Sequence, residues 1–358
     1  MSTSSQNIYN LIEETVKKKA SDLHISVGLP PTCRVNGRLY PLEYKILEPE
    51  DTEAFAKEIL NRQQMANLKK TGDIDISMSS FEKYRCRLNI FRQKNCYSLA
   101  FRMLNPDIYS FEALGLPSVL SDLCSLNRGL ILITGPTGTG KTTTLAAMVD
   151  WINTNRDCHI VTLEDPIEYV HQHKKSIVNQ REIGQDSLSY SSALRAVLRQ
   201  DPDVILIGEM RDLDSISIAL TAAETGHLVL STLHTIGASK TIDRIIDVFP
   251  PFQQHQIRTQ LSMVLQGVIS QQLLPLSDGS GRVVAAEVML ANSAIRNLIR
   301  EDKNHQIANV IQTSGEKGMK SMDISLMELI RKGKVSIGDA LAYATDPEYM
   351  KKMLSNNT

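Results

Sequence analysis

The sequence predicts an α/β protein. Its main domain is built on a largely parallel sheet, with a smaller α+β domain before it and a helical region at its C-terminal end. Short apolar runs alternate with helical patterns from Leu120 onward, which is typical of strands buried on both faces of a parallel sheet. Residues 1–105 instead mix short strand-like runs with two amphipathic helical patterns. A chain of 358 residues is too long for one ordinary core, so we expect two domains.

Residues 1–105 are predicted to form the smaller α+β domain. Its first helix carries apolar side chains on one face and lysines in its last turn, and Asn36-Gly37 is a two-residue hairpin signal. Pro and Gly residues over 106–117 indicate a linker. The expected elements are helices over 6–19 and 50–69, short strands within 23–47, and strands near 74–77, 84–91 and 97–103.

Residues 118–358 are predicted to form the main domain. Its apolar runs are short and continuous, because a strand covered by helices on both sides presents neither face to water. From residue 294 the pattern is helical to the end of the chain, which defines a C-terminal helical region over 294–358. The expected strands lie over 130–134, 159–163, 204–208, 228–232 and 283–289.

The bulk composition narrows the functional classes. Apolar residues make up 42% and charged residues 22%, as in soluble globular proteins, and the net charge of −1 disfavours a dedicated nucleic-acid binder. No apolar stretch approaches the ~18 residues of a membrane-spanning helix, and the N-terminus lacks a signal-peptide core, so we expect a cytoplasmic location. The five cysteines contain no C-x-x-C pair, which favours reduced thiols over disulfides or zinc.

The most specific motif is G-P-T-G-T-G-K-T over residues 135–142, a complete G-x-x-x-x-G-K-T phosphate-binding loop. An apolar run precedes it and a helix-forming run follows, which is the strand–loop–helix context that this motif requires. Lys141 is expected to reach the β- and γ-phosphates, and the Thr142 hydroxyl to hold Mg²⁺. The residues expected to bind the nucleotide are Gly135, Pro136, Thr137, Gly138, Thr139, Gly140, Lys141, Thr142 and Thr143.

Acidic residues follow two of the predicted strands. Glu209 comes after the apolar run 204–207 and is therefore expected at the carboxyl edge of the sheet, where α/β proteins bind ligands; there it would orient water or Mg²⁺. Three acids fall within residues 162–169, and one of them could act as a general base. From the pattern alone, a solvated acidic loop is the stronger interpretation of that segment.

Two histidines flank the strand predicted over 228–232. His227 and His234 are seven residues apart and would point to opposite faces, so they are poor partners for one metal ion. A strand-end histidine is usually structural. His234 nevertheless falls at the carboxyl end, near the other motifs, where it could sense a γ-phosphate.

These segments together resemble the secretion-ATPase superfamily of type II and type IV systems. Residues 162–169 resemble its Asp box, 203–209 its Walker B box and 225–235 its His box. The chain also lacks the four-cysteine zinc module of the extension ATPases, which favours the retraction branch of type IV pili. Further segments similar to that branch are 20–24, 28–31, 208–212, 294–301, 318–319 and 322–323, so the resemblance covers nearly the whole chain.

The resemblance implies a PAS-like N-terminal domain and a RecA-like ATPase domain, assembled as a homo-hexamer. It implies that the ring hydrolyses ATP with Mg²⁺ and drives an inner-membrane platform protein to depolymerise a pilus. The expected location is the cytoplasm at the pilus base, with a paralogous retraction ATPase as a further partner and no direct nucleic-acid contact. Glu164 becomes the candidate base, Glu209 the Walker B acid that joins Thr142 at Mg²⁺, and His227 and His234 the His-box residues.

Two further sets of residues take roles from the resemblance. Arg85, Arg87 and Arg102 are candidate arginine fingers supplied to a neighbouring subunit, although surface arginines on alternating strand positions are an equal interpretation. The helical pattern over 294–301 predicts one packed apolar face and one solvated charged face. The resemblance makes this segment a coupling element for retraction: Ala294, Ile295, Arg296, Asn297, Leu298, Ile299, Arg300 and Glu301.

Other functions stay open at this stage. Within the superfamily, the alternatives are the second retraction-type paralogue and an ATPase of pilus or secretion assembly. Outside it, a RecA-like DNA-dependent ATPase shares the phosphate loop and the sheet, and a non-catalytic nucleotide-gated partner would lack turnover. Hydrolysis chemistry is the same for extension and retraction, so the direction of work rests on the resemblance.

Overall fold

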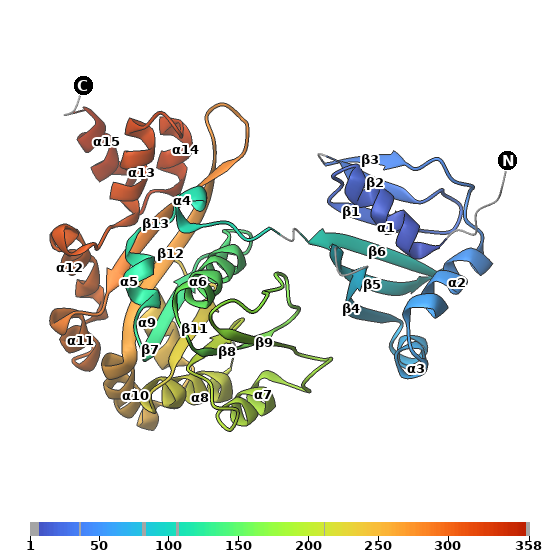
Figure 1. Ribbon diagram of the computed structural model, residues 1–358. Helices are drawn as coiled ribbons and strands as arrows, with labels where there is room; N and C mark the ends of the chain where they lie inside the picture. The colour runs from blue at the N-terminus through green and yellow to red at the C-terminus, as the bar shows by residue number, and fades with distance from the viewer. Residues whose placement is uncertain (1–6, 36, 81–83, 105–106, 211, 356–358) are drawn as a thin grey trace. The chain divides into compact units, whose positions relative to one another are not determined.

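The computed structural model describes residues 7–35, 37–80, 84–104, 107–210 and 212–355. Asn36 of the predicted hairpin, Arg211 and residues 105–106 at the predicted linker lie outside this part of the chain. Contacts divide the chain into two units, one made of residues 1–107 and 166–170 and the other of residues 108–165 and 171–358. Figure 1 labels the elements of both.

The first unit contains a six-stranded antiparallel sheet with strand order β3-β2-β1-β6-β5-β4. Alternate side chains of its strands, such as Leu88 and Phe101, join Leu11 and Phe55 of the helices in one buried core. The opposite face of the sheet carries polar side chains. The elements are α1 (Ile8–Lys17), β1 (Asp22–Ile25), β2 (Thr32–Val35), β3 (Arg38–Pro41), α2 (Pro49–Ile59), α3 (Arg62–Thr71), β4 (Asp73–Ser80), β5 (Tyr84–Gln93) and β6 (Cys96–Leu104).

The single helix predicted over 50–69 is wrong, because two helices occupy this segment. Leu60 is extended, and Asn61 starts the second helix as its N-cap. The Asn61 side chain accepts a hydrogen bond from the Gln64 N–H at 2.9 Å, and the Gln64 side chain accepts one from the Asn61 N–H at 3.0 Å. This reciprocal capping satisfies backbone donors that a continuous helix would not expose.

The second unit contains a seven-stranded sheet with strand order β13-β12-β7-β11-β10-β8-β9, parallel throughout except for the edge strand β13. The predicted α/β class is therefore confirmed. Two strands, β9 and β12, were not predicted. The strands are β7 (Gly129–Thr134), β8 (His159–Glu164), β9 (Ile177–Glu182), β10 (Val204–Ile207), β11 (Leu228–Leu233), β12 (Leu265–Pro275) and β13 (Arg282–Leu290).

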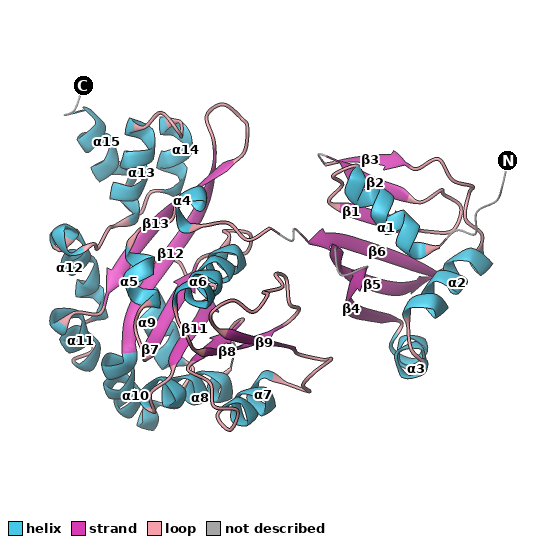
Figure 2. Cartoon of the chain, viewed as in Figure 1, coloured by secondary structure: helices cyan, strands magenta, loops and turns pink. Residues whose placement is uncertain are grey.

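Helices cover both faces of this sheet, as Figure 2 shows for the second unit. Ile131 and Ile133 of β7 pack on the face that also contacts α4 (Phe111–Leu114), α5 (Val119–Cys124) and α6 (Lys141–Asn155). Leu130 and Leu132 pack on the other face. The helices on that face are α7 (Tyr190–Val197), α8 (Leu213–Glu224), α9 (Ala238–Asp247), α10 (Pro251–Val264), α11 (Ser293–Arg300) and α12 (Ile307–Thr313).

The last part of the predicted C-terminal helical region packs around the ends of β12 and β13. Leu274 and Ala285 of these strands share a small core with the last helices. Those helices are α13 (Met322–Arg331), α14 (Ile337–Tyr343) and α15 (Pro347–Ser355). Within the described residues, no helix is both long enough and apolar enough to cross a membrane.

Candidate nucleotide-hydrolysis site

The phosphate-binding loop joins β7 to α6, as the sequence predicts. Gly135 has φ +141° and approaches β12 so closely that a Cβ atom would lie 2.4 Å from the carbonyl oxygen of Gln271. Gly138 and Gly140 have φ values of +82° and +86°, which favour glycine. The loop therefore needs glycine at these positions in order to curl back onto the start of α6.

Lys141 lies over this loop. Its side chain is buried, and its Nζ atom donates to the carbonyl oxygens of Gly135 at 2.8 Å and Pro136 at 2.9 Å. Burial lowers the pKa of Lys141, and the Glu209 carboxylate opposes that effect. The ammonium group is thus held at the loop, where it can bind phosphate oxygens.

His234 connects the loop to the acidic strand end. Its Nδ1 atom lies 3.4 Å from the Thr137 hydroxyl of the loop, and its Nε2 atom lies 3.6 Å from a Glu209 carboxylate oxygen. These three residues come from three segments that meet at the carboxyl edge of the sheet, after β7, β10 and β11. The structure therefore places the loop, the acid and the histidine together at this edge, as the sequence predicts.

The backbone around Glu209 is held by its neighbours. Thr232 donates from its hydroxyl to the Gly208 carbonyl oxygen at 2.6 Å, and the Met210 N–H donates to the Thr232 carbonyl oxygen at 3.3 Å. A Cβ atom at Gly208 would lie 2.9 Å from the Tyr190 hydroxyl. A larger residue before Glu209 would therefore contact the Tyr190 hydroxyl and the Leu163 carbonyl oxygen, and one of the groups would have to shift.

Glu164 is the last residue of β8. One of its carboxylate oxygens, Oε1, accepts from the Thr162 hydroxyl at 2.7 Å and from the Gln180 side-chain amide at 3.1 Å. Thr162 and Gln180 lie opposite each other in the parallel pairing of β8 with β9. Gln180 was not predicted, and the only signal for it would have been the strand β9 itself.

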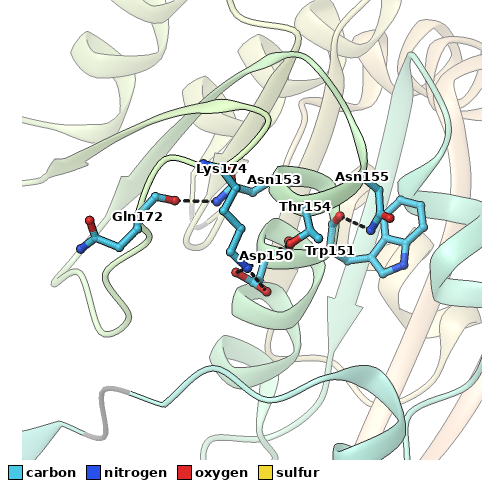
Figure 3. A network of polar contacts seen from close by, with 7 residues as sticks. All are labelled: Asp150, Trp151, Asn153, Thr154, Asn155, Gln172 and Lys174. Carbon is cyan, nitrogen blue, oxygen red and sulfur yellow. Dashed lines mark hydrogen bonds and ion pairs between the residues drawn. The ribbon is translucent and has the colours of Figure 1, made fainter.

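The chain after the acidic segment is fastened to α6. Asn153 of that helix donates to the Gln172 carbonyl oxygen at 2.7 Å and accepts from the Lys174 N–H at 3.0 Å. The Lys174 ammonium contacts both carboxylate oxygens of Asp150 at 2.7 and 2.9 Å (Figure 3). The segment that follows the Asp box is thereby tied to the helix that begins at Lys141.

Buried polar residues of β12 and β13 bond to the helices next to the site. The sequence did not predict them either. The Gln271 side chain is fully buried and exchanges hydrogen bonds of 2.8 and 3.1 Å with the Thr144 hydroxyl of α6. Ser270 and Glu287 lie opposite each other and accept the N–H groups of Gly237 and Ala238 at the start of α9. Burial raises the pKa of the Glu287 carboxyl group.

The structure does not bring every predicted residue to this edge. His227 lies at the amino end of β11, the opposite end from His234, and its Nδ1 atom lies 2.9 Å from the Ala222 carbonyl oxygen. Its predicted role stays a prediction.

The candidate arginine fingers lie in the first unit, on the polar face of its sheet. Arg87 contacts Asp75 at 3.7 Å, Arg102 contacts Asp22 at 3.3 Å, and Arg85 donates to the Ser77 hydroxyl at 2.9 Å. Arg87 and Arg102 are direct neighbours across β5 and β6. The hollow that they line has a volume of about 400 Å³, and its residues are Asp22, His24, Asp75, Arg87, Asn89, Ala100, Phe101 and Arg102.

The predicted coupling segment forms α11, with Ile295 and Ile299 fully buried as expected. Arg296, however, does not belong to a solvated face. Its Nη1 atom donates to the carbonyl oxygens of Ser262 at 2.5 Å and Met263 at 2.7 Å, at the C-terminal end of α10. Its pKa is lowered by burial. The expectation of a solvated Arg296 is wrong because the end of α10 offers unpaired carbonyl groups.

A glycine-rich loop between a buried strand and a helix, with an acid and a histidine at neighbouring strand ends, defines a P-loop nucleoside triphosphatase with a RecA-like sheet. The family model described as "Type II/IV secretion system protein" matches residues 2–341. The chain belongs to this family.

Individual relatives refine this placement. The "Type IV pilus retractation ATPase PilT" of Pseudomonas aeruginosa is 47% identical over 342 residues, which cover 96% of this chain and 99% of that protein. The "Type IV pilus ATPase PilU" of the same organism is 39% identical, with 96% and 90% covered. The crystal structure of "the Pilus Retraction Motor PilT and Bound ADP" matches with a TM-score of 0.92 and 46% identity, covering 98% of this chain and 100% of that one.

Proposed function

We propose that this chain is a hexameric motor that hydrolyses ATP and powers the retraction of a type IV pilus. The observation that carries the hydrolysis is the junction in which His234 contacts both the phosphate loop and Glu209. Similarity to PilT along nearly the whole chain supports a type IV pilus as the structure on which this motor acts. The identity to the retraction ATPase PilT, 47%, is higher than the 39% to the type IV pilus ATPase PilU, which favours a PilT-like role.

The residues present suit an Mg²⁺–nucleotide complex. Thr142 is the second residue of α6, so its hydroxyl belongs to the helix N-terminus, and Glu209 offers a largely buried carboxylate. Hydroxyl and carboxylate oxygens are the hard donors that Mg²⁺ prefers. When bound, the ion neutralises negative charge on the β- and γ-phosphates. Lys141 and backbone N–H groups from Thr137 to the start of α6 would hold those phosphates.

Glu164 is the proposed general base. It accepts the proton of a water molecule as that oxygen bonds to the γ-phosphorus, and the bond from phosphorus to the bridging oxygen of ADP breaks. The products are ADP and phosphate. Because His234 contacts both Thr137 and Glu209, it is placed to report the presence of the γ-phosphate to both.

Assembly completes the proposed motor. Arg85, Arg87 and Arg102 would neutralise charge on the transferred phosphoryl group of a neighbouring subunit in a homo-hexamer. Residues 294–301 would couple hydrolysis to the work of the ring. The partner would be an inner-membrane platform protein at the pilus base, reached from the cytoplasm, with a PilU-like paralogue as a second partner.

Substitution of the proposed base tests the hydrolytic role. Glu164→Gln should lower ATP turnover by about 100-fold or more, because the amide cannot accept the proton. ATP affinity should change little, since Glu164 is not among the residues that bind the phosphates. Steady-state phosphate release and equilibrium nucleotide binding measure the two effects. Unchanged turnover would remove Glu164 from this role, and DNA-stimulated turnover in the wild type would favour a RecA-like enzyme instead.

Deletion of the gene tests the direction of work. A retraction motor predicts abundant surface pili together with lost twitching motility, because assembly continues while depolymerisation stops. Electron microscopy measures the number of surface pili, and a surface-motility assay measures twitching. Absent pili would identify an assembly ATPase and contradict the proposal.

A further inference from the structure

We propose that Gln180 is a positioning residue that orients Glu164 and closes the base of the loop formed by residues 165–170. The proposal rests on the proposed function in one respect, which is that Glu164 acts as the base. Gln180 lies in β9, at the edge of the sheet, in the parallel pairing opposite Thr162 of β8.

The Gln180 amide makes two hydrogen bonds of opposite sense. Its Nε2 atom donates to Glu164 Oε1 at 3.1 Å, and its Oε1 atom accepts from the His171 N–H at 2.8 Å. Glu164 lies just before the loop and His171 just after it. The glutamine amide offers a donor and an acceptor in one planar group without a change of protonation state. One side chain therefore holds both ends of the loop.

Thr162 reinforces the contact to Glu164. Its hydroxyl donates to the same carboxylate oxygen at 2.7 Å. Two donors on one oxygen restrict the rotation of the carboxylate and so fix the direction from which it can accept a proton. A base must lie within hydrogen-bond reach of its proton, and a displacement of about 1 Å can cost about 100-fold in rate.

The backbone of His171 is itself held in place, so its N–H group is a fixed partner for the Gln180 amide. The next residue, Gln172, is held through its carbonyl oxygen by Asn153, a fully buried residue of α6 (Figure 3). The Lys175 and Ser176 N–H groups donate to the Asn153 carbonyl oxygen at 2.9 and 3.3 Å. Because α6 begins at Lys141, Gln180 links the proposed base through this segment to the helix that carries the phosphate loop.

Gln180→Met in the full-length protein tests the inference, because methionine keeps the length and removes both hydrogen bonds. The expected result is a kcat about 10- to 100-fold lower with the KM for ATP within about twofold of wild type. Asn179→Leu is the matched control. Asn179 is adjacent in β9 but contacts His159 rather than Glu164, so this variant should keep its kcat. A wild-type kcat in Gln180→Met would overturn the inference.

A double-mutant cycle separates positioning from general support. If Gln180 acts through Glu164, adding Gln180→Met to Glu164→Gln should lower the single-turnover rate by less than about twofold. An equal loss in both backgrounds would overturn the proposal. Should Gln180→Met fail to fold, Thr162→Val removes the other donor without a change of shape. It should lower kcat with KM kept, and an unchanged kcat would count against positioning.

The two failures are distinguishable. Wild-type turnover in Glu164→Gln would remove Glu164 as the base, which is the part of the proposed function that the inference needs. Loss of turnover in Glu164→Gln together with full activity in Gln180→Met would overturn the positioning role alone.

Discussion

Individual side chains in this site have properties that their surroundings impose. Lys141 has a lowered pKa because it is buried, yet the loop carbonyls and Glu209 keep a cation stable there. His234 is half-exposed and lies between two functional groups, whereas His227, from the same motif, bonds to a helix end. Residue type alone therefore does not determine the role of a side chain in the site.

His171 provides a residue-scale prediction about stability. Burial lowers its pKa to about 4, and its Nδ1 atom finds no partner among the described residues. In the unfolded chain the imidazole of residue 171 binds a proton near pH 6.5, whereas in the folded protein it binds one only near pH 4. Its contribution to the unfolding free energy is therefore fully present above pH 6.5 and is lost as the pH falls toward 4. The loss reaches about 3 kcal/mol.

Chemical denaturation at pH 7 and pH 5 measures this effect. The wild type should lose more unfolding free energy between the two values than His171→Leu, in which the titrating group is absent. The exposed His255→Gln serves as the control and should behave like the wild type. An equal loss in wild type and His171→Leu would contradict the prediction.

Among the elements, α10 and α11 pack against each other next to the sheet and are joined by side-chain contacts. Ile295 and Ile299 bury the apolar face of α11, and the guanidinium group of Arg296 binds the last carbonyls of α10. Arg258 of α10 also contacts Asp302 at 2.7 Å. α10 continues directly into β12, and Gln271 of β12 bonds to Thr144 of α6, so a continuous set of contacts joins α11 to the helix that follows the phosphate loop.

Replacement of Arg296 tests how much its hydrogen bonds between α11 and α10 contribute to stability. Arg296→Met should lower the unfolding free energy by about 1–3 kcal/mol, because carbonyl groups at the end of α10 lose a charged donor. Arg296→Lys should recover only part of this, because an ammonium group lacks the planar fork of donors. Thermal or chemical denaturation measures both, with the exposed Asn297→Ala as control. A stability equal to wild type in Arg296→Met would show that the contact contributes nothing.

At the level of the whole molecule, the chain divides into a unit with the arginines and a unit with the phosphate loop. Arg87 and Arg102 are both paired with carboxylates on the polar face of the first unit. Surface ion pairs of this kind contribute little to stability, so an exchange of partner toward a phosphate is inexpensive. This supports a role for these arginines when subunits assemble.

Mixed assemblies test whether the arginines act between subunits. Arg102→Ala and Lys141→Ala should each be nearly inactive as pure proteins. Co-assembled, some interfaces combine the intact arginine of one variant with the intact loop of the other, so ATP turnover should exceed that of either variant alone. Phosphate release from purified mixed rings checks this. Mixtures as inactive as the pure variants would indicate that Arg102 acts within its own chain, and a fully active pure Arg102→Ala would indicate that it has no role in turnover.

Much of the main domain follows from local patterns. The strands β7, β8, β10, β11 and β13 were predicted because a short, continuous apolar run between helical patterns is typical of a strand buried on both faces. The two missed strands lack that signal. The sequence I-V-N-Q-R-E of β9 is polar because β9 is an edge strand, and β12 carries polar residues such as Gln271 and Ser270 that bond to α6 and α9.

The phosphate loop, the acid Glu209 and five of the seven strands of the main sheet can be read from the sequence, because they depend on local spacing and on the periodicity of apolar residues. Glu164 is singled out only by the family resemblance. The three-dimensional arrangement is needed to see that His234 reaches Thr137 and Glu209, that Gln180 bonds to Glu164, and that Arg296 caps α10. The reason is that these contacts depend on the order and register of strands distant in sequence, and long-range packing sets both.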